Sequence, residues 1–198
     1  MNVIKFIFFG LIFFTSCILM AIDDPCIQIK ETSENVLKMV YSNSQNTEEE
    51  ILAYLSDNYN LDIIIRRTLG RNWKKIKPEH QSKVITLIKH LVLRAYIDGL
   101  RGREVPDIKY KDTKYISSKR AEVPTFIYFS GKPINLTYRL GLVSDRWEIF
   151  DISVENISIV LTYRIQFDMF LANNSSDALV KKLETLLTNE NLGKELPL

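Results

Sequence analysis

Residues whose chemistry suits metal binding are few in this chain. Two histidines, His80 and His90, lie ten positions apart on one predicted helix. At the rise of an α-helix their rings would be separated by about 15 Å along the axis, too far to share a metal ion. The chain has two cysteines, Cys17 and Cys26, and so few thiols make no zinc-binding pattern. We therefore expect no metal centre and no cofactor.

Three carboxylates are the remaining candidates for acid–base chemistry, because Asp62, Asp151 and Glu155 could form a pair. Asp62 falls in the first turn of a predicted helix, and Glu155 precedes another, where the helix dipole stabilises a negative charge. Asp151 interrupts an apolar strand, and we interpret it as a structural hydrogen-bond acceptor. Cys26 would lie near a chain end, and no G-x-S-x-G nucleophile motif occurs. These patterns favour a protein that is not an enzyme.

The charge balance argues against nucleic acid as a partner. The 198 residues include 26 Lys and Arg against 24 Asp and Glu, a net charge of +2, whereas nucleic-acid binders usually show a basic face. Cationic residues do form one basic cluster, which consists of Arg66, Arg67, Arg71, Lys74, Lys75 and Lys77. Arg101 and Arg103 could extend this cluster. This cluster is either a solvated face or a patch for an anionic partner or lipid head groups.

The first residues have the layout of a secretory signal peptide. Lys5 precedes an uncharged stretch of 17 residues, 6–22, and Ala21 is a suitable small residue at the cleavage position. We expect cleavage after Ala21, which would leave 22–198 as a single domain in the periplasm. Two alternatives stay open. Cys17 could be lipidated, or the segment could remain as an anchor, since 17 residues is near the lower limit for spanning a bilayer.

Apolar periodicity predicts an α+β fold. Helical spacing and capping residues predict helices over 28–41, 47–55, 61–69, 78–100, 159–172 and 177–187. From residue 107 the apolar period changes to two, which predicts strands over 107–116, 123–129, 134–142 and 147–154. The expected architecture is a four-stranded antiparallel meander with helices mainly on one face.

Three of these elements are more apolar than a surface position requires. Helix 78–100 has an apolar arc of about 200°, compared with the ~100° stripe of an ordinary surface helix. Strands 123–129 and 147–154 are apolar on both faces. Either other elements cover this surface or part of it lines a cavity.

Two motifs are fairly specific in combination. The first is L-G-x-x-W at residues 69–73, and the second is D-x-x-V-E-x-x-S-x-V-x-x-Y-R-x-Q-F at residues 151–167. With the stretches around 59–62, 78–81, 95–96 and 131–150, they make residues 28–187 resemble the MlaC/toluene-tolerance (Ttg2-type) family of periplasmic phospholipid-binding proteins. Asn156 stands where that family usually has Gly, and Asn is the residue that next best tolerates a positive φ.

The resemblance implies a non-enzymatic carrier whose hydrophobic pocket, between sheet and helices, holds the tails of a diacyl phospholipid. Such a carrier passes lipid between an outer-membrane lipoprotein complex and an inner-membrane ABC transporter complex, and so maintains outer-membrane lipid asymmetry. Apolar residues within the matching stretches are the expected lipid contacts: Trp73, Leu87, Leu91, Tyr96, Tyr138, Trp147, Phe150, Val160, Tyr163 and Phe167. Three alternatives remain: a hopanoid-associated carrier of the same family, a protein-interaction module with a filled core, and an unrecognised hydrolase.

Overall fold

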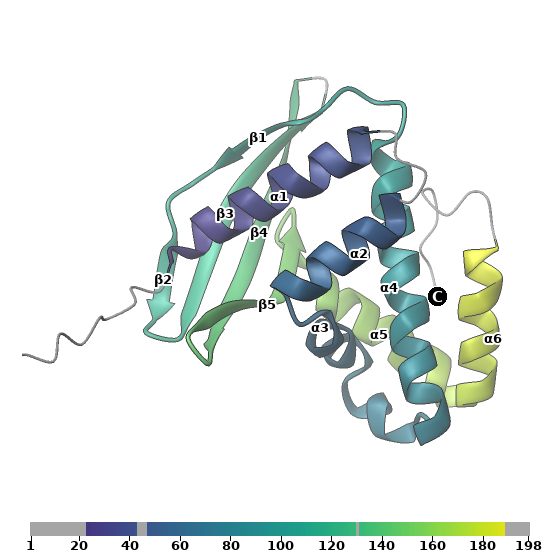
Figure 1. Ribbon diagram of the computed structural model, residues 1–198. Coiled ribbons are helices and arrows are strands. Elements are labelled where there is room, and N and C mark those ends of the chain that lie inside the picture. The colour runs from purple at the N-terminus through teal and green to yellow at the C-terminus, as the bar shows by residue number, and fades with distance from the viewer. Residues whose placement is uncertain (1–22, 43–46, 130, 189–198) are drawn as a thin grey trace, which may run out of the picture.

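The computed structural model describes residues 23–42, 47–129 and 131–188, and these residues form the α+β fold that the sequence predicts (Figure 1). The helices are α1 (Pro25–Tyr41), α2 (Thr47–Asn58), α3 (Leu61–Leu69), the 3₁₀ helix η1 (Gly70–Lys75), α4 (Pro78–Leu100), α5 (Ile159–Asn173) and α6 (Ser176–Leu187). The predicted signal peptide, and Cys17 within it, lie outside the described residues. Within the described ranges, no helix has the length and apolar character needed to cross a membrane.

The sheet is antiparallel and larger than predicted. Its strands are β1 (Asp107–Tyr110), β2 (Lys114–Ser117), β3 (Arg120–Phe129), β4 (Lys132–Val143), β5 (Arg146–Val154) and β6 (Ile157–Ser158). They follow the order β1-β3-β4-β5-β6, and β2 also pairs with β3. The expected four-stranded meander is therefore right for the central strands and wrong in the number of strands, which is six among the described residues.

The expected strand 107–116 is divided in two because of a proline on its neighbour. β1 pairs with residues 125–128 of β3, and β2 pairs with residues 120–122. Pro124 lies between these two regions, where its carbonyl accepts a hydrogen bond of 2.9 Å from the Lys111 amide. Since proline has no N–H, it cannot return a bond to the edge strand. The ladder is interrupted there.

The turn between β5 and β6 accommodates Asn156. Glu155 and Asn156 have φ of 47° and 66°, the pair of left-handed residues typical of a two-residue hairpin turn. The Glu155 carboxylate accepts hydrogen bonds from the backbone and side-chain nitrogens of Asn135 at 2.6 and 3.0 Å, and these bonds lower the pKa of Glu155. The hydrogen bonds of the Glu155 carboxylate thus connect the turn to β4, while its predicted role at the dipole of the following helix stays a prediction.

Side-chain caps begin the helices that surround the core. Asp24 accepts from the Cys26 amide at α1, Asn60 from the Ile63 amide at α3, and Ser158 from the Leu161 amide at α5. Ser175 caps α6, which begins at Ser176, one residue before the start of the predicted helix 177–187. Each cap satisfies an N–H that has no partner within the helix, so each helix start is defined locally.

The core has three parts, and α4 runs through two of them. One cluster joins α3, α4, α5 and α6, a second joins the sheet to α1 and α3, and a third joins α1, α2 and α4. In Figure 1, α1 crosses the sheet, whereas α4 and α6 stand side by side away from it. The wide apolar arc of α4 is therefore covered by several neighbours.

Candidate functional site

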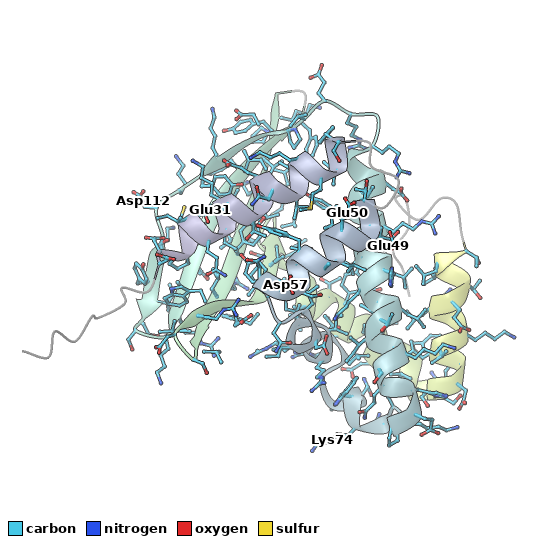
Figure 2. All side chains as sticks on the ribbon, in the orientation of Figure 1. Glu31, Glu49, Glu50, Asp57, Lys74 and Asp112 are labelled. Carbon is cyan, nitrogen blue, oxygen red and sulfur yellow. The ribbon has the colours of Figure 1, made fainter. Side chains whose placement is uncertain are left out.

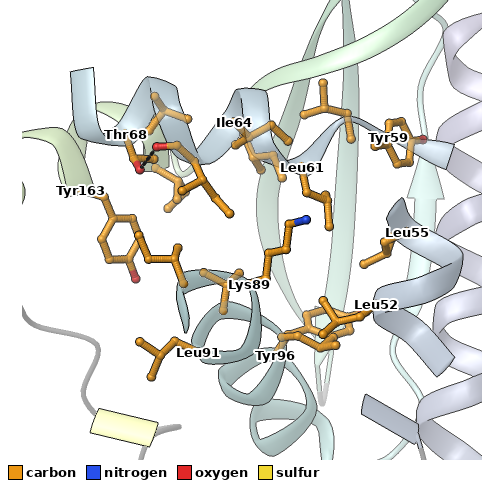
Figure 3. A pocket seen from close by; sticks show the side chains of 18 of the residues that line it. Leu52, Leu55, Tyr59, Leu61, Ile64, Thr68, Lys89, Leu91, Tyr96 and Tyr163 are labelled. Carbon is orange, nitrogen blue, oxygen red and sulfur yellow. Dashed lines mark hydrogen bonds between the residues drawn. The ribbon is translucent and has the colours of Figure 1, made fainter. Parts of the chain in front are cut away.

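A cavity of about 440 Å³ lies between the sheet and the helices. Within the described part of the chain, helices α1 to α6 and strands β4 and β5 contribute to its wall, mostly with leucine, isoleucine and valine side chains. Figure 3 shows Leu52, Leu61 and Leu91 among them. Val92 and Tyr96 of α4 line it and are 51% and 42% exposed, which indicates an opening to solvent beside α4. The volume lies within the range of small-molecule binding sites.

The structure brings six of the ten expected lipid contacts together in this wall: Leu91, Tyr96, Tyr138, Val160, Tyr163 and Phe167. They come from α4, β4 and α5, elements that are distant in sequence. The other four, Trp73, Leu87, Trp147 and Phe150, lie elsewhere.

Trp147 and Phe150 are outside the cavity for different reasons. Trp147 is 5% exposed in the core between α1 and the sheet, with its ring centroid 6.1 Å from that of Tyr115. Phe150 is the unpaired residue of a bulge in β5, opposite the step from Arg139 to Leu140. Its ring lies under two guanidinium groups, those of Arg67 at 5.4 Å and Arg120 at 4.5 Å.

Cations also lie over two other aromatic rings of strand β3, which the sequence predicts to be apolar on both faces. Lys111 lies 5.7 Å from the Phe126 ring and Lys109 lies 4.9 Å from the Tyr128 ring. Cations therefore cover the second face of the sheet at these rings, and this surplus apolar surface does not line the cavity.

Trp73 and Leu87 pack against the cluster of α3, α4, α5 and α6 without reaching the cavity. The Arg66 guanidinium covers the Trp73 ring at 5.0 Å. The tryptophan of the L-G-x-x-W motif therefore has a packing role at the end of α3.

Several wall residues were missed because they lie on the first two helices. Ile29, Thr32, Ser33 and Val36 of α1 and Leu52 and Leu55 of α2 all line the cavity. The α1 positions follow the i, i+3, i+4, i+7 spacing of one helix face, a signal that was present in the sequence. This spacing identifies a buried face but does not distinguish a filled core from an empty space.

Two hydroxyl groups of the wall, those of Tyr59 and Thr68, donate to protein partners. The Tyr59 hydroxyl donates to Thr32 Oγ1 at 3.3 Å, and Thr68 Oγ1 donates to the Ile65 carbonyl at 2.7 Å (Figure 3). Burial raises the pKa of Tyr59 to about 12 and also raises the pKa of Tyr138. These phenols are therefore neutral at physiological pH and leave the cavity apolar.

The raised pKa of Tyr59 predicts a loss of stability in alkali. Its pKa is about 12 when folded and ~10 when unfolded, so the unfolded state releases the proton first. The contribution is complete below pH ~10 and falls by about 1.4 kcal/mol per pH unit as the pH rises toward 12. Tyr59→Phe should make the fall of Tm between pH 10 and 12 shallower. Equal slopes for Tyr59→Phe, the wild type and the control Tyr128→Phe would contradict this assignment.

The carboxylates considered for catalysis have structural partners. Asp151 is 7% exposed and accepts hydrogen bonds from Arg139 Nη1 at 2.9 Å and from the Val160 amide at 3.2 Å, as its interpretation as an acceptor predicts. Asp62 lies in the first turn of α3 and forms an ion pair of 2.7 Å with Lys89. Among the described residues, no group of three or more His, Cys, Asp or Glu side chains could hold a metal ion.

Cys26 is ordered in the first turn of α1 rather than loose at a chain end. Its Sγ lies 3.5 Å from the Lys111 carbonyl, to which it donates. Burial and the neighbouring Asp24 carboxylate raise the pKa of the thiol. Since the thiolate is the nucleophile, this environment does not activate Cys26.

Four residues of the basic cluster have separate partners, which are carboxylates or aromatic rings. Arg71 pairs with Asp168 at 3.5 Å and Lys77 pairs with Asp177 at 2.8 Å, and the guanidinium groups of Arg66 and Arg67 stack on rings as described above. Arg101 follows the far end of α4, whose 23 residues span about 35 Å. Arg101 and Arg103 therefore do not extend the cluster.

Comparisons with known proteins agree with this architecture. The family model described as MlaC protein matches residues 30–185. The solved structure of the phospholipid-binding protein from Ralstonia solanacearum, in complex with a phospholipid, is similar with a TM-score of 0.73 and 20% sequence identity. The similarity covers 84% of this chain and 100% of that chain, and at this identity it shows the fold. No curated protein sequence matches the chain.

Proposed function

Since the chain belongs to the MlaC family, we propose that it binds a diacyl phospholipid with the acyl tails in the apolar cavity. The observation that carries this proposal is the cavity itself, with its aliphatic wall and its opening beside α4. The phospholipid held by the R. solanacearum protein of similar fold supports the same ligand class. A protein-interaction module with a filled core would have no use for this empty apolar space.

Carriage rather than catalysis is the activity that this site suits. Two tails of about 16 carbons bring roughly 30 CH₂ groups, each worth about 0.8 kcal/mol when removed from water. A membrane provides nearly the same environment as the cavity, so exchange between the two can be close to neutral. We therefore propose a periplasmic shuttle, exported by the signal peptide, that moves phospholipid between an outer-membrane lipoprotein complex and an inner-membrane ABC transporter complex.

Native mass spectrometry of the protein purified from cells tests the proposal. We expect a mass increase equal to one diacyl phospholipid, and we expect the lipid to pass to acceptor vesicles that contain none of that species. Protein that is consistently empty, and that takes up no lipid from vesicles, would contradict the proposal. Lipid hydrolysis lost in Asp151→Asn would instead favour the hydrolase.

A further inference from the structure

A second cavity, of about 400 Å³, adjoins the apolar one. It lies where α2 ends, α3 begins and the turn from β4 enters β5, and its wall is mainly polar. Tyr59, Leu61 and Lys89 line both cavities. The two spaces are therefore neighbours, one apolar and one polar, as the tails and head group of a phospholipid require.

Lys89 connects the two spaces. It is the charged residue of the apolar wall, and Figure 3 shows its side chain extending from α4 with Nζ beside Leu61. The Lys89 side chain is 23% exposed, and its Nζ lies 2.7 Å from Asp62 Oδ1. A lysine can lay its aliphatic part on an apolar wall while its ammonium group reaches a polar region.

The polar cavity presents cations and carboxylates together. Its cations are Lys89 and Arg146, and its carboxylates are Asp57, Asp62 and Glu148. An anionic head group would pair with the cations but would also face three carboxylates. A head group that carries a phosphate and an ammonium group can satisfy both signs of charge.

The existing contacts leave the Asp57 carboxylate available for a ligand. Arg146 Nη2 donates to the carbonyls of Asp57 and Asn58 at 3.3 and 3.1 Å, which uses part of its guanidinium group. Glu148 Oε2 accepts from the Asn60 amide at 2.9 Å. The Asp57 carboxylate has no ion pair or hydrogen bond within the described part of the chain, and Figure 2 shows it near the end of α2.

We propose that the polar cavity binds the head group of an aminophospholipid and so selects the cargo. Lys89 and the free donors of Arg146 contact the phosphate, and Asp57 accepts hydrogen bonds from the primary ammonium. When Lys89 contacts the phosphate it leaves its ion pair with Asp62, and the Asp62 carboxylate then provides a second acceptor for the ammonium group. This inference rests on the proposed function, since it assigns the head-group end of the same lipid.

Loading from mixed vesicles tests the selection. Lipid-free protein would be incubated with vesicles of equal phosphatidylethanolamine and phosphatidylglycerol with identical acyl chains, and the bound lipid would be extracted and quantified by mass spectrometry. Because a partly exposed ion pair changes affinity by a small factor, we expect about threefold enrichment of phosphatidylethanolamine. Asp57→Asn should bring the bound ratio toward that of the vesicles, because the variant loses the acceptor for the ammonium group.

Matched variants separate the head-group contact from other effects. Glu49→Gln removes an exposed acid at the opposite end of α2 and should keep the enrichment (Figure 2). Asp62→Asn provides a second test should Asp57→Asn fold poorly, and it should also reduce the enrichment. A bound ratio equal to that of the vesicles in the wild type, or one unchanged in both aspartate variants, would overturn the inference.

Total loading distinguishes this inference from the proposed function. Lipid bound at a normal level with no head-group preference overturns the head-group site alone, whereas no bound lipid of either kind overturns both. Inorganic phosphate added to lipid-free protein provides a further arm. Phosphate binding that is lost in Lys89→Gln and does not weaken when the protein is loaded with lipid would show a site for a soluble anion, and would overturn the head-group assignment.

Discussion

Leu91→Arg is expected to empty the apolar cavity of lipid. Leu91 is 2% exposed and lines the cavity from α4. An arginine there places a charge where the acyl tails would lie, and a charge without a partner in an apolar space costs several kcal/mol. We expect the lipid that co-purifies with the protein to fall by at least about tenfold, measured by native mass spectrometry.

The effect on lipid must be separated from an effect on folding. Leu91→Met keeps an apolar side chain of similar volume and should retain the lipid. Leu55→Arg places the same charge at a partly exposed wall position of α2, where the folded state tolerates it better. Circular dichroism would show that each variant is folded. Normal lipid content in folded Leu91→Arg and Leu55→Arg would mean that the tails bind elsewhere.

Arg139→Met is expected to destabilise the fold because it leaves the buried Asp151 carboxylate without its cationic partner. Arg139 Nε lies 3.2 Å from Glu122 and Nη1 lies 2.9 Å from Asp151, so one guanidinium joins β3, β4 and β5. The Asp151 side chain is 9% exposed, whereas that of Arg139 is 34% exposed. Loss of the charged hydrogen bond should lower the free energy of unfolding by about 2–3 kcal/mol. For a domain of this size that is a fall of roughly 5–10 °C in Tm.

Two controls test whether Asp151 causes this effect. Glu122→Gln changes the more exposed acid and should cost less than about 1 kcal/mol. Arg139→Met combined with Asp151→Asn removes the buried charge while keeping an acceptor for the Val160 amide, and should recover part of the stability. Urea unfolding curves of the single and double variants provide the comparison. A double variant no more stable than Arg139→Met would show that the arginine acts mainly through packing.

Helix ends and strand alternation were predictable because their causes are local. The sequence predicts α3 and α4 with their observed bounds, since Asn60 caps one and Pro78 begins the other. Alternation over 134–142 predicts the two faces of β4, and Leu140 is buried while Arg139 is partly exposed. Asp151 was identifiable as an acceptor because a charge in an apolar strand needs a partner. The divided edge strand was not predicted, since the break depends on Pro124 lying opposite it.

The sequence by itself determined the fold class, the family and which side of each element is apolar. It did not determine which apolar sides meet and which enclose an empty space. Phe150 and Tyr163 look equivalent in sequence, yet a bulge places Phe150 under arginines while Tyr163 lines the cavity. The contact of Lys89 with Asp62 joins two helices across 27 positions. Periodicity depends on residues one turn away, whereas a cavity depends on how six helices and a sheet pack, and only the tertiary structure decides that.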